Sequence, residues 1–115
     1  MITWRRRLFE GRAGRREKLA LEKFIKTLDY RKQCMAWRII TEEALRSRTG
    51  VRHNHYLRRA FLRLWDEIFS TLDEEKLEQL FHILKLPYWK SEGTWKQALE
   101  EIVENMRREY TTWSA

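Results

Sequence analysis

The sequence predicts an all-α protein, a compact bundle of four to five helices that includes one long helix in the first half. Three observations favour this fold class. Apolar residues recur at spacings of three and four along most of the chain, as they do on the buried face of a helix. One Pro and four Gly leave long stretches uninterrupted. No segment alternates apolar and polar residues for long enough to predict a strand, and no Asn-Gly or Asp-Gly pair marks a hairpin.

Length and composition indicate one domain. The chain has 115 residues, of which 43% are hydrophobic and 13% are aromatic. This length is typical of a single domain, and this composition is typical of chains that bury a core. We therefore expect a single helical domain over 1–115, with 1–14 as a basic N-terminal arm. One Cys excludes an internal disulfide framework, which favours a reducing compartment and a cytoplasmic location.

The arm is expected to contain a short helix over 4–10. Phe9 is among the residues that this helix would turn inward. Gly11 and Gly14 follow it closely, and glycines so close together favour an interruption before the next helix.

The long stretch 15–48 contains neither Gly nor Pro. Leu21, Leu28 and Met35 recur every seven residues, which places them on one stripe of a helix, and Phe24, Ile25 and Ile39 fill much of the space between them. Either one helix of about 34 residues runs here, about 50 Å long at 1.5 Å per residue, or two helices meet near 27–30. One long helix, straight or bent at that point, is the favoured interpretation. Thr27 and Asp29 are the plausible internal caps.

The second half predicts three further elements. Gly50 suits a turn after a helix end, and Asn54 suits the cap of the next helix. Two sequences with the spacing of a capping box, Thr71–Glu74 and Thr94–Gln97, are expected to open the last two helices. Pro87 is expected to end the first of these two. The inward-facing residues predicted from spacing are Leu57, Phe61, Leu64, Trp65, Ile68, Leu72, Leu77, Leu80, Phe81, Leu84, Trp95, Ala98, Leu99, Ile102, Val103 and Met106. The last five residues are expected to form a fraying tail.

The polar residues predict no enzyme, no metal site and no cofactor. Cys34 is expected to be a buried or half-buried packing residue of its helix. His53 and His55 form a pair that lacks the further ligands of a structural zinc site. Adjacent acids such as Glu42 and Glu43 point about 100° apart on a helix, so they do not form a two-carboxylate site by themselves. No run of about 18 apolar residues predicts a membrane span.

Charge is unevenly distributed along the chain. The net charge is +7, but residues 1–65 hold 18 Lys and Arg against 6 Asp and Glu, whereas residues 66–115 hold 6 against 11. The first part is therefore +12 and the second −5. Such asymmetry favours a half that faces a polyanion. Two solvated faces that neutralise each other within the bundle remain the alternative.

Arginine outnumbers lysine in the basic part, as is expected where planar guanidinium groups bind phosphate. Contacts of this kind position a strand without reading its sequence. No helix-turn-helix, zinc-finger or RNP pattern accompanies them, so binding is expected to tolerate any sequence. The candidate nucleic-acid-binding residues are Arg5, Arg6, Arg7, Arg12, Arg15, Arg16, Arg31, Lys32, Arg38, Arg48, Arg52, Arg58, Arg59 and Arg63.

The tryptophans divide into two groups. Trp65 and Trp95 fall at inward-facing positions and are predicted to be core residues. Trp89 and Trp113 fall in a loop and in the tail, where they either pack over the end of the bundle or anchor a partner subunit. They are the candidate partner-binding residues.

A small, basic, wholly helical chain with an acidic last third resembles the small subunit of Cascade-type CRISPR effector complexes. The resemblance covers size, helix order and charge layout, and no residue-level motif carries it. It implies a helical subunit that holds a guide–target hybrid or a displaced DNA strand on a positive face. It also implies that the acidic half contacts other subunits of the complex, which include further copies of the chain.

Two other classes of function fit the same features. One is a helical nucleoprotein of a virus or phage, which would polymerise on long nucleic acid. The other is a basic adaptor or inhibitor that binds an acidic protein partner and has no affinity for nucleic acid at physiological salt. A membrane partner is not expected.

Overall fold

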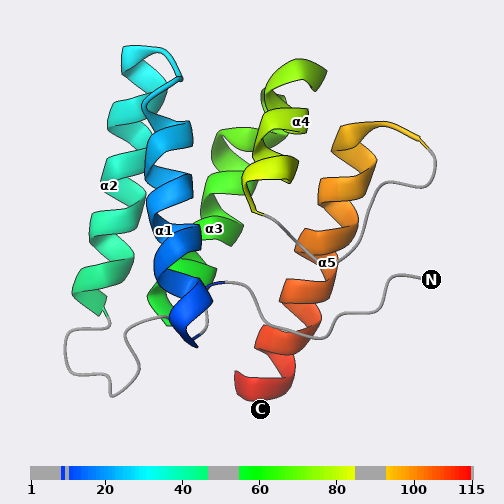
Figure 1. The fold of residues 1–115 in the computed structure, drawn as a ribbon. Helices are drawn as coiled ribbons and strands as arrows, with labels where there is room; N and C mark the ends of the chain where they lie inside the picture. The colour runs from blue at the N-terminus through cyan, green and yellow to red at the C-terminus, as the bar shows by residue number, and fades with distance from the viewer. Residues whose placement is uncertain (1–8, 10, 47–54, 85–92, 115) are drawn as a thin grey trace.

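A computed structural model describes residues 9, 11–46, 55–84 and 93–114, and within these ranges every regular element is helical. The all-α bundle predicted from the sequence is therefore confirmed (Figure 1). Helix α2 packs chiefly on α3, whereas α4 packs on α5 and on α1, and α5 also meets α3. The elements are α1 (Gly11–Ile25), α2 (Tyr30–Arg46), α3 (His55–Glu67), the short 3-10 turn η1 (Phe69–Thr71), α4 (Glu74–Ile83) and α5 (Trp95–Ser114).

The described part of this stretch, 15–46, forms two helices, so one helix of about 34 residues was wrong and the alternative break near 27–30 is confirmed. Helix α2, with 17 residues, is the long helix expected in the first half. Two side chains end one helix and begin the next. The Thr27 hydroxyl donates to the Phe24 carbonyl (2.7 Å). The Lys32 amide donates to Asp29 Oδ1 (2.9 Å), which gives α2 a capped start. Helices α1 and α2 then run side by side as a hairpin (Figure 1).

The start of α1 differs from the expected pattern. Helix α1 begins at Gly11 and continues through Gly14, so these glycines do not separate it from a later helix. Phe9, the described residue of the arm, has a φ of 64° and is fully buried. Its amide donates to the carboxylate of Glu17, which is itself buried. Phe9 is therefore held inside the bundle; the rest of the helix expected over 4–10 lies outside the described residues.

One of the two capping boxes is confirmed. At the start of α5, the Thr94 amide donates to Gln97 Oε1 (2.9 Å) and the Gln97 amide donates to Thr94 Oγ1 (3.1 Å). At the start of α4 the cap is instead Asp73, whose carboxylate accepts from the Lys76 amide (2.9 Å). The box expected over Thr71–Glu74 was wrong because Thr71 closes η1, with its hydroxyl bonded to the Ile68 carbonyl (2.7 Å).

Glu74, the acid expected to complete that box, connects two helices. Its carboxylate accepts from the Trp95 and Lys96 amides at the start of α5, both at 3.1 Å. A carboxylate at a helix N-terminus satisfies free amides and interacts favourably with the helix dipole. The C-terminal end also differs from expectation: α5 continues through Ser114, so residues 111–114 are helical rather than a frayed tail.

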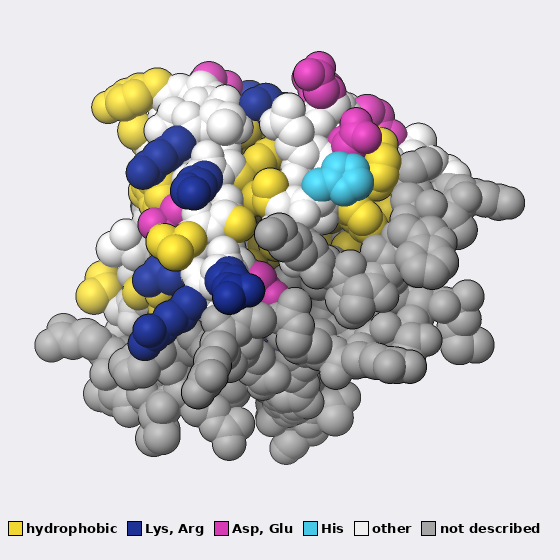
Figure 2. Space-filling view, viewed as in Figure 1, with side chains coloured by type: hydrophobic (Ala, Val, Ile, Leu, Met, Phe, Trp, Pro, Cys, Tyr) yellow, Lys and Arg dark blue, Asp and Glu magenta, His cyan; other side chains and the backbone are white. Residues whose placement is uncertain are grey.

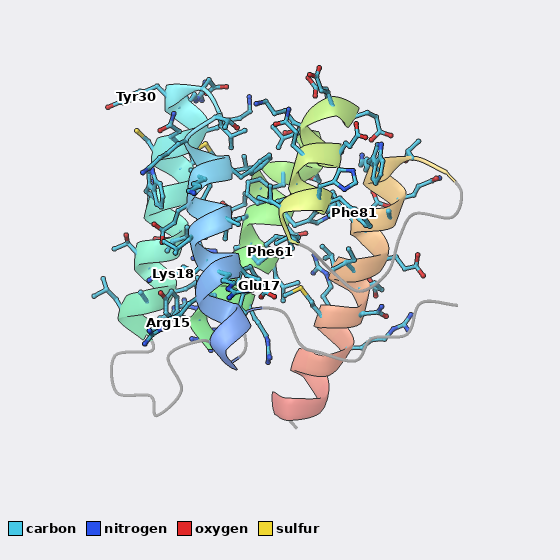
Figure 3. The ribbon with its side chains drawn as sticks, in the orientation of Figure 1. Arg15, Glu17, Lys18, Tyr30, Phe61 and Phe81 are labelled. Atoms are coloured by element: carbon cyan, nitrogen blue, oxygen red, sulfur yellow. The ribbon has the colours of Figure 1, made fainter. Side chains whose placement is uncertain are left out.

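The core contains nearly all of the residues predicted to face inward. Phe61 lies at its centre, with its ring 5.8 Å from that of Phe9 and 6.1 Å from that of Phe69, centroid to centroid (Figure 3). Trp65 is buried, as predicted. Trp95 is half-buried and packs 5.1 Å from Phe81, also between ring centroids. Leu72 is likewise half-buried against the core. The core therefore joins all five helices of the described chain.

Candidate nucleic-acid interface

The structure describes only part of the predicted nucleic-acid-binding set. Arg12 belongs to α1, but its side chain is outside the described part. Of the candidate partner-binding residues, Trp113 belongs to α5 but its side chain is outside the described part, and Trp89 lies outside the described residues. Five further arginines of the set lie outside them too: Arg5, Arg6, Arg7, Arg48 and Arg52.

Of the three candidate phosphate-binding arginines on α3, Arg58 is buried, whereas Arg59 and Arg63 are partly exposed and paired with acids of the protein. Arg58 is only 6% exposed. It lies three residues before Phe61 and seven before Trp65, on the stripe of α3 that faces the core. The four-residue spacing of Arg59 and Arg63 places them on one edge of α3, and in the structure that edge faces α2.

Arg59 and Arg63 converge on Glu43 of α2, a carboxylate whose side chain is 1% exposed. Arg59 Nε lies 3.0 Å from Glu43 Oε1, and Arg63 Nη1 lies 3.0 Å from Glu43 Oε2. Arg63 also donates to Glu42 Oε1 at 3.0 Å and lies 3.4 Å from Glu67 Oε2. The hydrogen bonds to these carboxylates raise the pKa of the Arg63 guanidinium. These ion pairs join α2 to α3.

Glu43 was missed as a structural residue because adjacent acids were considered only as a catalytic pair. A signal for it exists in the sequence. Glu43 lies seven residues after Ala36 and four after Ile39, and all three are the buried residues of α2. An acid on a buried stripe requires a cationic partner, and the Arg59–Arg63 pair supplies it at a spacing of four residues.

Most of the exposed cations of the described chain lie on the α1–α2 hairpin. We call this surface the α1–α2 basic face. In Figure 2 most of the dark-blue side chains lie over these two helices, at the left of the view, and acidic side chains cluster over α4. Arg15 projects from α1 near its first turns (Figure 3). The exposed basic side chains of the face are Arg15, Arg16, Lys26, Arg31, Arg38 and Arg46. Lys23 is also exposed but lines the space between α1 and α4.

Members of this face differ in how they are engaged. Arg15, Arg16 and Arg31 form no ion pair with another described residue. The Arg38 side chain is 80% exposed and only 3.9 Å from Glu42, a loose contact one helical turn away. Lys32 is different, because its ammonium lies 2.8 Å from Asp29 Oδ2 and lowers the pKa of that carboxyl. Of the predicted set, four arginines therefore remain available to an anionic ligand.

Apolar side chains lie between these cations. The exposed large hydrophobic residues of the described chain are all on α1 or α2. Tyr30, at the start of α2, is 82% exposed and points away from the bundle (Figure 3). Cys34 is also exposed, which contradicts the expectation of a buried or half-buried packing residue. The other exposed hydrophobic residues are Leu19, Met35 and Leu45.

No protein-family model matches the chain, and no curated protein or solved structure matches it significantly. Functional assignment therefore depends on the residues of this chain. Among the helices over 11–46, 55–84 and 93–114, none is both long and apolar enough to cross a bilayer. Over the same ranges, His, Cys, Asp and Glu side chains form no group of three or more that could hold a metal ion.

Proposed function

We propose that the chain is a non-catalytic subunit of a cytoplasmic ribonucleoprotein complex that binds nucleic-acid backbone through the α1–α2 basic face. The observation that carries this proposal is the separation of exposed charge. Arg15, Arg16 and Arg31 face solvent with no ion pair to another described residue, and Arg38 has only a loose contact with an acid, whereas acids concentrate on α4 and α5. Unpaired guanidinium groups on a helical surface bind phosphate well and distinguish sequences poorly.

Spacing on α2 supports the same proposal. Arg31 and Arg38 are seven residues apart, which places them on one side of the helix and about 10.5 Å apart along its axis. Arg15 and Arg16 extend the positive surface onto α1. A surface of this breadth fits an extended phosphate backbone rather than one phosphate group. The resemblance to the CRISPR effector small subunit belongs to this proposal as one form that such a complex could take.

The test is a salt titration with a matched pair of variants. Arg31→Gln/Arg38→Gln removes two charges from the basic face. Lys96→Gln/Arg108→Gln removes two exposed charges from α5, so this variant and the α2 variant have the same net charge. Binding of labelled single-stranded and duplex DNA and RNA is measured between low and physiological salt. We expect the α2 variant to bind about tenfold more weakly. The slope of log K against log salt should become shallower by about 0.7 for each phosphate that the variant no longer neutralises.

The α5 variant is the control for net charge. Equal weakening by both variants would show a diffuse charge effect and would contradict a specific face. Wild-type chain that binds no nucleic acid at low salt would contradict the proposal altogether. Each variant is first checked for unchanged helicity and unfolding midpoint.

One observation favours a second candidate, the basic adaptor that binds an acidic protein. Leu19, Met35 and Leu45 contribute aliphatic surface among the cations, and aliphatic side chains add little to a phosphate contact. A protein partner with acidic and apolar residues would use both kinds of side chain. Under this alternative Met35→Ser/Leu45→Ser abolishes partner binding, whereas under the nucleic-acid proposal it leaves nucleic-acid affinity unchanged.

A further inference from the structure

A groove runs between α1 and α4, away from the outer edge of α2. Its volume is about 580 Å³. One wall contains residues 20, 23 and 24 of α1 and residue 27 just after it, and the α4 wall contains residues 75, 78, 79, 82 and 83. Both sets follow the three- and four-residue spacing of one helical stripe. The groove is therefore bounded by two helices over about two turns of each, or roughly 10–12 Å of axis.

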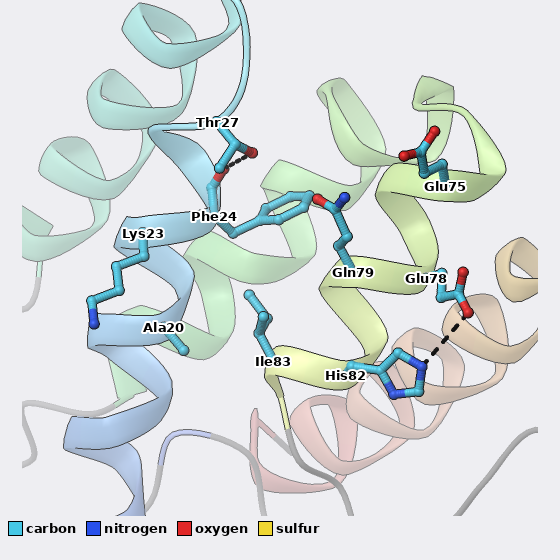
Figure 4. Close-up of a pocket in the computed structure, with 9 residues that line it drawn as sticks. All are labelled: Ala20, Lys23, Phe24, Thr27, Glu75, Glu78, Gln79, His82 and Ile83. Atoms are coloured by element: carbon cyan, nitrogen blue, oxygen red, sulfur yellow. Dashed lines mark hydrogen bonds and ion pairs between the residues drawn. The ribbon is translucent and has the colours of Figure 1, made fainter.

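The floor of the groove is apolar. Figure 4 shows Phe24 directed from α1 toward α4, and Ile83 and Ala20 directed into the space between the two helices. Hydrogen bonds join the two walls at one end of the groove: Lys76 Nζ on α4 lies 3.1 Å from Thr27 Oγ1 and 3.4 Å from the Thr27 carbonyl oxygen. Apolar carbon at the floor of an open channel between two helices is the surface that the apolar stripe of another helix covers.

The two sides of the groove differ in the charge that they carry at the rim. On the α4 side, Glu75 is exposed and Glu78 is half-buried. His82 lies 3.8 Å from Glu78, one turn further along α4. On the α1 side the one cation is Lys23, and its ammonium points away from α4 in Figure 4. The groove thus presents an acidic wall on a protein whose net charge is +7.

We propose that this groove binds an amphipathic helix of a partner protein, with apolar residues on the floor and Lys or Arg residues toward α4. The apolar stripe would cover the half-buried Ala20 and Ile83, above the buried ring of Phe24. The basic residues would lie within reach of Glu75 and Glu78, where opposite charges favour the correct orientation and a faster encounter. This surface is separate from the α1–α2 basic face, so the proposal does not depend on nucleic-acid binding.

The probe is a displayed library of helical peptides with randomised surface positions, selected on the full chain. Each selected peptide is then measured against three variants. Gln79→Trp fills the groove from an exposed position of α4, where a larger side chain does not disturb the core. Glu75→Lys/Glu78→Lys reverses the charge of the α4 wall. Glu100→Lys/Glu101→Lys makes the same charge change at exposed positions of α5 and is the control.

The expected result has two parts. Peptides carrying apolar residues at i, i+4 and i+7 with flanking Lys or Arg are enriched, and Gln79→Trp weakens them at least about tenfold, or 1.4 kcal/mol. The α4 reversal weakens them similarly, and the α5 reversal does not. The proposal is overturned if no selected peptide depends on Gln79, or if the groove-dependent peptides are acidic or bind the α4 reversal unchanged. Ala20→Leu, which fills the groove from α1, repeats the test should Gln79→Trp fail to fold.

Discussion

Glu43 shows how a single residue can determine the role of several others. Its carboxylate lies inside the bundle, and the guanidinium groups of Arg59 and Arg63 satisfy it at 3.0 Å each. The desolvation of such a carboxylate is unfavourable, and its arginine partners offset that cost. The two arginines are only partly exposed, and their charges are engaged by this buried carboxylate.

Glu43→Ala should therefore destabilise the protein strongly. We expect a decrease of about 3 kcal/mol in the free energy of unfolding, because two partly buried arginines lose the buried carboxylate that they share. Urea denaturation followed by circular dichroism measures it. Glu42→Ala is the matched control, since Glu42 is partly exposed and should cost no more than about 1 kcal/mol. Equal effects of the two substitutions would contradict the buried network.

The same network changes how the arginines of α3 should be tested. Charge along the chain alone predicts that joint neutralisation of Arg58, Arg59 and Arg63 weakens nucleic-acid binding without unfolding. The structure instead leads us to expect destabilisation, because that change removes the two arginines hydrogen-bonded to Glu43 together with a buried guanidinium, and leaves only the exposed Arg46 at 3.6 Å. Weaker binding by such a variant could come from lost phosphate contacts or from lost stability. The Arg31→Gln/Arg38→Gln variant avoids this ambiguity, because neither arginine lies in the buried network.

Asp29 gives a prediction about pH. Its hydrogen bonds with the Lys32 side chain and amide lower the pKa of the carboxyl below the ordinary value. A carboxyl with a lowered pKa in the folded state contributes stability above its unfolded pKa, and that stability is lost as pH falls through the folded pKa. We expect Asp29→Asn to remove this acid-side loss while keeping an oxygen at the cap. Carboxyl titration by NMR checks it, and Lys32→Met should raise the pKa toward its ordinary value.

At the scale of the elements, local chemistry sets where each helix begins. The hairpin of α1 and α2 exists because Asp29 caps α2 and Thr27 closes α1 within four residues. Glu74 illustrates a contact between elements, since it is a first-turn acid of α4 and also accepts from two amides of α5. The relative placement of α4 and α5 is thus fixed by polar groups as well as by the core.

The position of the α4 cap is directly testable. Asp73→Ala should cost about 1 kcal/mol in the free energy of unfolding, because the amide of Lys76 loses its acceptor. Thr71→Ala should cost less, since Thr71 lies in η1 and is exposed. Thermal and urea unfolding of the two variants measure the difference. A larger effect of Thr71→Ala would place the cap two residues earlier, as the sequence pattern alone suggested.

At the scale of the whole molecule, charge along the chain becomes charge on two surfaces. The α1–α2 hairpin carries exposed arginines and lysines, and α4 with α5 carries most of the exposed acids of the described chain. An anionic backbone on the hairpin and a cationic helix in the α1–α4 groove would bind different parts of the surface. The two experiments are therefore independent: the salt titration tests the hairpin, and the peptide selection tests the groove.

Most of the fold could be predicted from the sequence, because helical periodicity is a local property. Leu77, Leu80 and Phe81 of α4 and Leu99, Ile102 and Met106 of α5 are all buried at the predicted spacing. The capping box of Thr94 and Gln97 could also be predicted from the sequence, since both partners lie within one turn. The candidate site was less predictable. Arg15, Arg16, Arg31 and Arg38 stay exposed, but charge counts could not distinguish them from the arginines of α3.

The sequence by itself determined the all-α class, the positions of the buried stripes and the excess of positive charge in the first 65 residues. Each of these depends on residues close together along the chain. Tertiary structure decided which cations face solvent, because Arg59 and Arg63 meet Glu43 from positions 16 and 20 residues away. It also decided that α1 and α4 enclose an acidic groove. Both outcomes arise from packing between helices, where long-range contacts determine whether a charged side chain is neutralised within the protein or left to bind a partner.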